Sequence, residues 1–184
     1  MSLPLLTLDF DGVICHPLHA ANTGIRREFL DPLAPPPPAR VYPRWLGAPL
    51  DHLRFDLRRP MPGVRQALLD LAAVRRLAIV TGRRSPPTGW LRRHGLDGLV
   101  ERVVVNRTAL RSPHFKLTTL RALGADEHID DDPRTAQLLA QAGGLPIYLA
   151  DWPRNRDLPF DPRVQRVADL VDLARRLREP AGGA

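Results

Sequence analysis

The stretch LTLDFDGVICHP, at positions 6 to 17, ends an apolar run with two carboxylates, Asp9 and Asp11. In an extended chain, side chains two positions apart point to the same side, so both carboxylates leave the strand together. Like charges this close repel each other unless a cation lies between them. The pattern predicts a metal-binding or catalytic pair at the C-terminal tip of a buried strand. On this stretch alone, a pair that only caps a turn remains an alternative.

Three other places carry groups suited to phosphate or metal chemistry. Thr81 and Gly82 follow an apolar run, and a run of three aspartates, 130–132, follows another. Lys116 is the only lysine among 27 basic residues. An ammonium is a compact point charge, whereas a guanidinium is larger and planar. The lone lysine therefore marks a place where arginine does not fit, unless its uniqueness is chance.

The elements that must position these groups alternate along the chain. Apolar runs predict five strands, at 5–9, 77–81, 102–105, 127–130 and 146–149. Helical periodicity predicts helices over 64–74, 88–94, 117–123, 135–141 and 167–178. This alternation is typical of an α/β fold with a doubly wound parallel sheet of about five strands. Ligands of such sheets bind beyond the carboxyl ends of the strands, where Asp9, Thr81 and Asp130 are expected.

The segment 16–60 interrupts the alternation. It contains four consecutive prolines at 35–38, which favour extended polyproline II structure. We expect a small Pro-rich cap or insert with short helices over 25–30 and 50–57, rather than a linker. The core is then formed by 1–15 and 61–178, and 179–184 form a frayed tail.

A short cluster next to the proline run combines Tyr42, Arg44 and Trp45. Packing of the insert onto the core is the favoured interpretation of this cluster. The alternative is that it closes over the strand ends and contacts the leaving group of a substrate.

The four pieces, in their order and context, resemble the motifs of the haloacid dehalogenase (HAD) superfamily of phosphohydrolases. The resemblance covers 1–15 and about 61–150. It includes DFDG at Asp9, VTG at Thr81, the helical Lys116, and IDDDP around Asp131. A looser likeness to nucleotidase-type members rests on the DGV opening, the IDD motif and the stretch after the fifth strand. The resemblance implies a HAD-type, Rossmann-like core with an insert between the first and second motifs.

The resemblance also implies roles. Asp9 would be the nucleophile that forms an aspartyl-phosphate, and Asp11 the acid and base. The Thr81 hydroxyl and the Gly82 N–H would bind phosphoryl oxygens. Lys116 would offset the charge of the nucleophile and the phosphate.

A Mg²⁺ ion is implied between the Asp9 carboxylate, the Asp11 backbone carbonyl and an acid of the run 130–132. Asp132 precedes Pro133, a pair typical of a helix N-cap followed by its first residue. Alignment with the family motif favours Asp131 as the metal ligand and Asp130 as its neighbour or the lysine partner, although either could bind directly.

The expected function is a Mg²⁺-dependent phosphomonoester hydrolase acting on a small phosphorylated metabolite, with a nucleotide as one candidate. The net charge of +7 would favour a nucleic-acid end phosphatase, but the arginines are scattered and only ten residues are aromatic. A catalytically inactive binding protein of the same fold is the other alternative. The single cysteine excludes an internal disulfide, and the absence of a signal peptide or apolar span favours a cytoplasmic protein without a membrane partner.

Overall fold

Six parallel strands form a single sheet in the computed structural model, which describes residues 2–17, 29–36, 57–156 and 158–179. The spatial order is β3-β2-β1-β4-β5-β6. The strands are β1 (Leu5–Leu8), β2 (Arg76–Thr81), β3 (Arg102–Val105), β4 (Glu127–Asp130), β5 (Ile147–Ala150) and β6 (Val164–Val167). The predicted α/β doubly wound parallel sheet is confirmed. Its strand order is Rossmann-like: from the central β1, strands β2 and β3 follow on one side and β4, β5 and β6 on the other.

The expected number of about five strands is too low, because the sequence analysis missed β6. This strand lies at the edge of the sheet and pairs only with β5 among the described residues. Gln165 is exposed and Arg166 is partly exposed, so only two of its four residues are buried. Such a strand lacks the continuous apolar run that identifies a central parallel strand.

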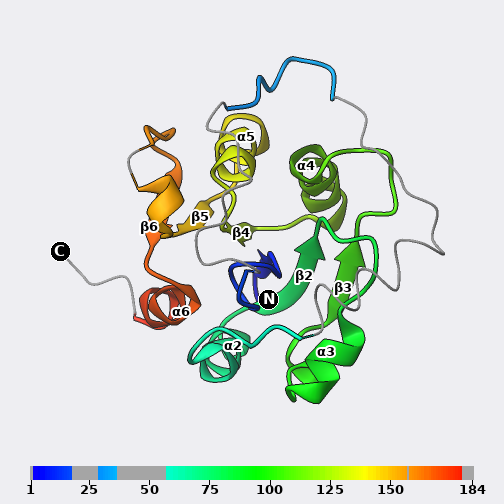
Figure 1. The fold of residues 1–184 in the computed structure, drawn as a ribbon. Coiled ribbons are helices and arrows are strands. Elements are labelled where there is room, and N and C mark those ends of the chain that lie inside the picture. The colour runs from blue at the N-terminus through cyan, green and yellow to red at the C-terminus, as the bar shows by residue number, and fades with distance from the viewer. Residues whose placement is uncertain (1, 18–28, 37–56, 157, 180–184) are drawn as a thin grey trace.

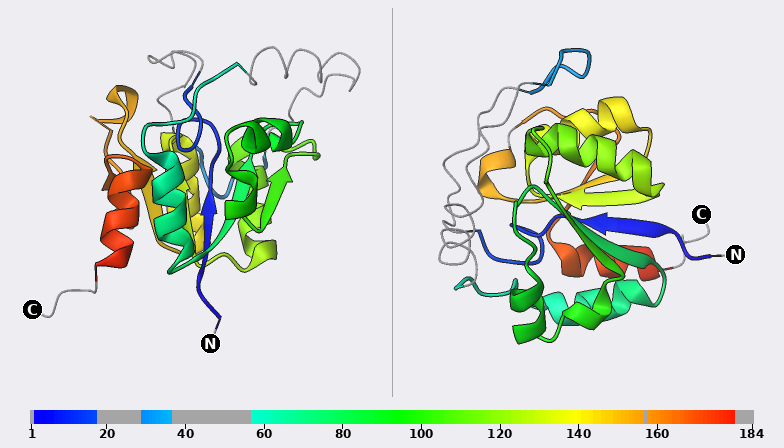
Figure 2. Two further views of the ribbon diagram at one scale, coloured as in Figure 1. Left: turned by 90° about the horizontal axis from the view of Figure 1, so that it is seen from below. Right: turned by 90° about the vertical axis from the view of Figure 1, so that its right-hand side faces the viewer.

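Helices cover both faces of the sheet (Figures 1 and 2). On one face lie α2 (Val64–Ala72), α3 (Thr88–Arg93) and α6 (Leu170–Arg178), and on the other lie α4 (Ser112–Leu123) and α5 (Pro133–Gly143). Two single-turn 3₁₀ helices, η1 (Asp97–Leu99) and η2 (Pro153–Asn155), complete the elements. No helix in the described residues combines the length and apolar character needed to cross a membrane.

Each face has its own apolar core. Leu8 and Ile79 pack with Leu68 of α2 on one face. On the other face, Val80 and Leu139 belong to the cluster that joins the sheet to α4 and α5. Successive strand residues point to opposite faces of the sheet, and all four residues of β1 are buried. Its one polar residue, Thr7, donates to the Glu127 carbonyl at 3.0 Å.

Three helices start at places other than those predicted. The helix expected over 135–141 begins two residues earlier, at Pro133. The helix expected over 117–123 begins at Ser112, so Lys116 lies in its second turn and does not open it. Pro113 fits there because the first turn of a helix needs no backbone N–H donor.

The helix expected over 167–178 begins at Leu170. Val167 ends β6, and the Asp169 side chain caps α6 by accepting a 2.9 Å hydrogen bond from the Asp172 N–H.

Most of the predicted insert 16–60 lies outside the described residues, as do Tyr42, Arg44, Trp45 and most of the two short helices expected around them. Within the described parts, Phe29 packs against Phe160 with ring centroids 5.6 Å apart. At its other end, the Met61 N–H donates to the Ile14 carbonyl at 2.9 Å, next to the loop that follows β1. The proposed division into core, insert and tail stays a prediction.

Candidate active site

The register of the sheet brings the predicted site residues to one end. Leu8 is paired with Ile79 on one side and Ile129 on the other. Asp9 directly follows β1, and Thr81 and Asp130 are the last residues of β2 and β4. All three therefore lie at the same edge of the sheet. The Asp9 N–H donates to the Ile129 carbonyl at 2.9 Å, which extends the pairing of β1 with β4 by one residue.

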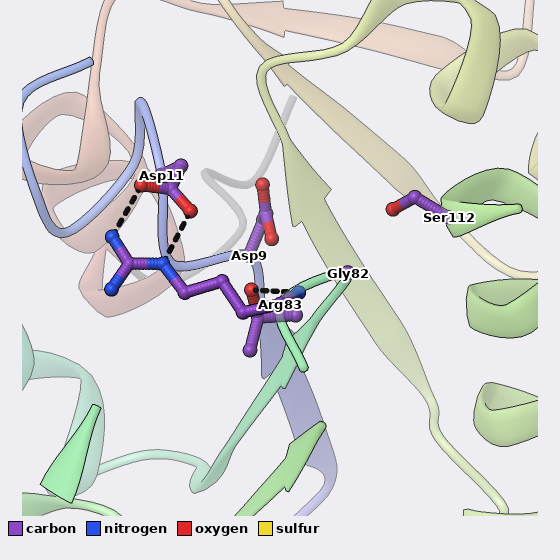
Figure 3. Close-up of a pocket in the computed structure, with 6 residues that line it drawn as sticks. Asp9, Asp11, Gly82, Arg83 and Ser112 are labelled. Carbon is purple, nitrogen blue, oxygen red and sulfur yellow. Dashed lines mark hydrogen bonds and ion pairs between the residues drawn. The ribbon is translucent and has the colours of Figure 1, made fainter. Parts of the chain in front are cut away.

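A cavity of about 270 Å³ opens at this edge of the sheet (Figure 3). It is lined by Asp9, Asp11, Thr81, Gly82, Arg83 and Ser112. Four of these were predicted from the sequence as site residues, and Arg83 and Ser112 were not.

Lys116 lies between two carboxylates. Its Nζ is 2.9 Å from Asp9 Oδ1 and 2.7 Å from Asp130 Oδ2, and its side chain is 2% exposed. Burial opposes the charge of Lys116, but the two carboxylates raise its pKa well above the ordinary value. The lone lysine is therefore a buried cation beside the predicted nucleophile.

Asp130 is held on both oxygens. Oδ2 accepts from Lys116 and lies 3.1 Å from His128 Nε2, while Oδ1 accepts from the Asp132 N–H at 2.9 Å. Burial opposes ionisation, but Lys116 and His128 hold the pKa of Asp130 below its ordinary value. The other ring nitrogen of His128 lies 2.9 Å from Thr7 Oγ1, so a buried polar chain orients Asp130 from within the sheet. Asp130 is thus the lysine partner in this arrangement.

Asp132 has the capping position expected for it. Its side chain accepts from the Arg134 N–H at the start of α5, and Pro133 is the first helical residue. Asp130 and Asp131 therefore face the site, and Asp132 belongs to the helix.

Asp9, Asp130 and Asp131 form a buried cluster in which one carboxylate oxygen of each lies within 4.8 Å of the others. Burial raises the pKa of Asp9 to about 7, and the charges of Asp130 and Asp11 add to this effect while Lys116 opposes it. A cation beside Asp9 would favour its carboxylate form. An all-oxygen donor set fits a hard divalent cation such as Mg²⁺.

Gly12 shapes the same cluster. Its φ is +80°, and a Cβ built on it would overlap the carboxylate of Asp131. Only glycine adopts this conformation readily and leaves the space that Asp131 occupies. The glycine after the paired aspartates therefore lets the two halves of the acidic cluster approach each other.

Asp11 stands apart from the acidic cluster, because its side chain is bound by two arginines. Arg83 donates from Nε to Oδ2 at 2.8 Å and from Nη2 to Oδ1 at 2.6 Å (Figure 3). Arg58 donates from Nη1 to Oδ1 at 2.6 Å. The sequence offered a weak signal for Arg83, which follows Thr81 and Gly82 at a strand end. It offered none for Arg58, which lies at the end of the predicted insert.

Two of the predicted phosphate-binding residues, Thr81 and Gly82, line the same cavity as Asp11. Thr81 is buried, and its Oγ1 accepts from the Arg83 N–H at 3.3 Å. A Cβ on Gly82 would collide with Ser112 Oγ and lie 2.8 Å from Ser112 Cβ. Ser112 lines the cavity and lies four residues before Lys116, so the two side chains are on the same face of α4. That four-residue spacing is the signal by which Ser112 could have been found.

Solved structures with the same fold span almost the whole chain. The L-2-haloacid dehalogenase of Xanthobacter autotrophicus superposes with a TM-score of 0.66 at 12% identity, covering 98% of this chain and all of that one. A HAD-superfamily hydrolase of subfamily IA from Geobacter sulfurreducens gives 0.59 at 19% identity, covering 95% and 100%. The chain has the HAD fold.

A proposed phosphoglycolate phosphatase from Lactobacillus plantarum has this HAD fold too, with a TM-score of 0.60 at 18% identity over 96% of this chain and all of that one. No protein-family model matches the sequence, and no curated protein matches it either. At these identities the likeness concerns the fold. The roles expected for Asp9, Asp11, Thr81 and Lys116 stay predictions.

Proposed function

We propose that this chain is a Mg²⁺-dependent phosphomonoester hydrolase that works through an aspartyl-phosphate on Asp9. The observation that carries the proposal is the position of Asp9 at the cavity, 2.9 Å from the buried Lys116 ammonium and within the acidic cluster. A carboxylate nucleophile needs nearby positive charge to approach a phosphate dianion, and Lys116 supplies part of it. The substrate is a small phosphorylated metabolite.

The chain's own groups account for both halves of the reaction. A carboxylate oxygen of Asp9 attacks phosphorus and the bond to the leaving oxygen breaks, while Asp11 gives its proton to that oxygen. Asp11 then takes a proton from water, which attacks phosphorus and releases inorganic phosphate with the Asp9 carboxylate restored. Thr81 Oγ1 and the Gly82 N–H donate to phosphoryl oxygens, and Ser112 supplies a further hydroxyl at the same cavity.

The acidic cluster would hold the metal through Asp9 and Asp131, with the Asp11 backbone carbonyl as a further ligand. When bound, Mg²⁺ offsets negative charge on the phosphoryl oxygens. Asp130 keeps Lys116 charged and in place, as its two short contacts with Lys116 and His128 indicate.

Dehalogenation is the competing reaction, because structures with this fold include dehalogenases, one with chloropropionic acid covalently bound. Asp11 favours phosphoryl transfer. An alkoxide is a poor leaving group, and an acid two residues after the nucleophile can protonate it as it leaves. The three-carboxylate cluster also favours a metal-assisted reaction.

Hydrolysis of p-nitrophenyl phosphate by the purified full chain tests the proposal. We expect turnover with Mg²⁺, none with excess EDTA, and none in Asp9→Asn. Turnover of 2-chloropropionate without phosphate-ester hydrolysis would indicate a dehalogenase. A strong preference for phosphorylated oligonucleotide ends over small esters would indicate a nucleic-acid end phosphatase. Absence of any turnover would indicate a binding protein.

A further inference from the structure

Trp152 connects two loops that follow different strands of the sheet. It lies two residues after the end of β5, and its indole Nε1–H donates to the Gly12 carbonyl at 3.1 Å. Gly12 lies in the loop after β1, and the strand order places β4 between β1 and β5. The hydrogen bond therefore joins the loops on either side of β4, the strand that ends at Asp130.

The loop that carries Trp152 is held by a buried asparagine. Asn155 is completely buried, accepts from the Trp152 N–H at 3.1 Å and donates from Nδ2 to the Ala150 carbonyl at 2.9 Å. Arg166 of β6 donates to the Asn155 carbonyl at 3.0 Å and to the Asp151 carboxylate at 2.6 Å. These bonds fix the backbone around Trp152, so its indole extends from a rigid support.

The acceptor of the indole bond is the residue that lets the acidic cluster assemble. Gly12 has a φ of +80°, and a Cβ there would overlap the Asp131 carboxylate. Glycine rotates about its backbone bonds more freely than other residues, so its conformation must be fixed from outside. The Gly12 N–H donates to the Cys15 carbonyl at 2.8 Å, which holds the peptide group before it. Trp152 holds the peptide group after it.

The peptide group before Gly12 also carries the Asp11 carbonyl, the backbone ligand expected for the metal. In a trans peptide the carbonyl points away from the N–H, so the bond to Cys15 directs the Asp11 carbonyl away from Cys15. Rotation about the Gly12 backbone would turn this carbonyl relative to the peptide group that Trp152 holds. The two hydrogen bonds together limit that rotation.

We propose that Trp152 is a positioning residue for the metal site: its indole N–H holds Gly12 so that the Asp11 carbonyl and the Asp131 carboxylate are arranged for a divalent cation before it binds. This inference rests on the proposed function, whose metal it concerns. A ligand set that is ordered in advance loses less conformational freedom on binding. Loss of the N–H should therefore weaken Mg²⁺ binding and leave the chemistry of the loaded enzyme unchanged.

Trp152→Phe tests the proposal, because it removes the N–H and keeps an aromatic ring. Calorimetric titration of metal-free protein with Mg²⁺ should show a Kd raised about two- to tenfold, the scale of one hydrogen bond. Half-maximal turnover of p-nitrophenyl phosphate should need correspondingly more Mg²⁺. At saturating Mg²⁺, kcat should equal that of the wild type, because the lost interaction acts on metal binding.

Tyr148→Phe is the matched control. It also removes one hydrogen bond made by a residue of the β5 region, from the Tyr148 hydroxyl to Glu127 at 2.9 Å. Glu127 begins β4, whereas the site lies where β4 ends. This variant should keep the wild-type Kd for Mg²⁺ even if it lowers the free energy of unfolding.

Hydrogen exchange of the Trp152 indole N–H, followed by NMR in the wild type, tests the same coupling without a substitution. If the indole bond favours Mg²⁺ binding, Mg²⁺ must favour the bond to the same extent, so the exchange should slow when Mg²⁺ is added. This measurement decides the question if Trp152→Phe does not fold.

Three results overturn the inference: an unchanged Kd for Mg²⁺ in Trp152→Phe, an equal loss of affinity in Tyr148→Phe, or indole exchange that Mg²⁺ does not slow. Mg²⁺ binding that is weakened in Trp152→Phe, without turnover of any phosphate ester by the wild type, contradicts the phosphatase function and supports the inference. Phosphate-ester turnover in excess EDTA by a wild type that binds no Mg²⁺ overturns the inference and leaves phosphate-ester hydrolysis standing.

Discussion

Asp9 and Lys116 form an ion pair that is almost completely removed from solvent. Nζ and Oδ1 lie 2.9 Å apart, and the two side chains are 9% and 2% exposed. Such a pair contributes little net stability, because both partners lose their hydration. Asp9 lines the cavity, together with Thr81, Gly82, Arg83 and Ser112. The pair therefore holds a buried positive charge next to a carboxylate that faces the cavity.

Replacing Lys116 by arginine is expected to lower turnover by about 100-fold or more, because a planar guanidinium cannot occupy the point between Asp9 and Asp130 without displacing Asp9, the proposed nucleophile. Lys116→Met removes the cation and leaves two buried carboxylates, so it should cost about 3–5 kcal/mol of unfolding free energy in metal-free protein. Urea unfolding and p-nitrophenyl phosphate turnover measure the two effects. Wild-type turnover in Lys116→Arg would show that the unique lysine is coincidental.

Asp9→Asn is expected to fold normally and to lose turnover by about 10⁴-fold or more, as removal of a nucleophile commonly does. The neutral amide suits the buried position, since burial already raises the pKa of Asp9 to about 7. Beryllium fluoride with Mg²⁺ should raise the melting temperature of the wild type and not that of the variant. Asp97→Asn, at an exposed position, is the control and should behave like the wild type in both assays. A melting temperature of Asp9→Asn that rises with beryllium fluoride would contradict attack by Asp9.

Cys15 is expected to resist alkylation in the native protein. The side chain is fully buried, and burial together with the charge of Asp11 raises the pKa of its thiol to about 12. Because the folded-state pKa lies above the unfolded value, the contribution of the thiol to stability is complete below about pH 9. It is lost as the pH rises towards 12. Mass spectrometry after iodoacetamide treatment at pH 8 should show no adduct in native protein and full modification in urea. Rapid native alkylation would show that the loop after β1 opens readily.

The sequence was most informative where a side chain follows a central strand. Asp9, Thr81 and Asp130 each end a buried apolar run. Because the strands pair in parallel, such residues lie at one edge of the sheet regardless of the conformation of the loops. Lys116 was identifiable by chemistry alone, as one ammonium among guanidiniums. Its exact place in the helix was missed because Ser112 and Pro113 start the helix with residues that the apolar periodicity does not count.

Residues that reach the site through loops were not predictable in the same way. Arg58 precedes α2 and lies beside Asp11 because the chain just after it is hydrogen-bonded to the loop that follows β1. The His16 N–H donates to the Arg59 carbonyl at 2.9 Å, and the Met61 N–H donates to the Ile14 carbonyl at 2.9 Å. No periodicity encodes that contact. His128 lies between Glu127 and Ile129 in β4 and is fully buried. The sequence does not distinguish an imidazole buried for packing from one that orients Asp130.

Gly12→Ala is expected to weaken Mg²⁺ binding and turnover strongly, for two separable reasons. An alanine at φ +80° is strained by about 1 kcal/mol, and its Cβ would overlap the Asp131 carboxylate. Gly95→Ala is the matched control: its φ is +63°, but a Cβ there meets nothing within 4 Å. We therefore expect both variants to lose a similar strain energy in urea unfolding of metal-free protein, with an additional loss in Gly12→Ala.

The additional loss of unfolding free energy should depend on the Asp131 side chain and not on strain in the backbone. The double variant Gly12→Ala/Asp131→Ala should regain much of the unfolding free energy, because the overlapping atoms are gone. Its Mg²⁺ affinity, measured by calorimetry, should stay low. Non-additivity of this kind is expected for residues in direct contact. Wild-type Mg²⁺ affinity in Gly12→Ala would mean that Asp131 can move aside and still bind the metal, or that it is not a ligand. Asp131→Ala alone separates these outcomes, because it weakens Mg²⁺ binding only if its carboxylate is a ligand.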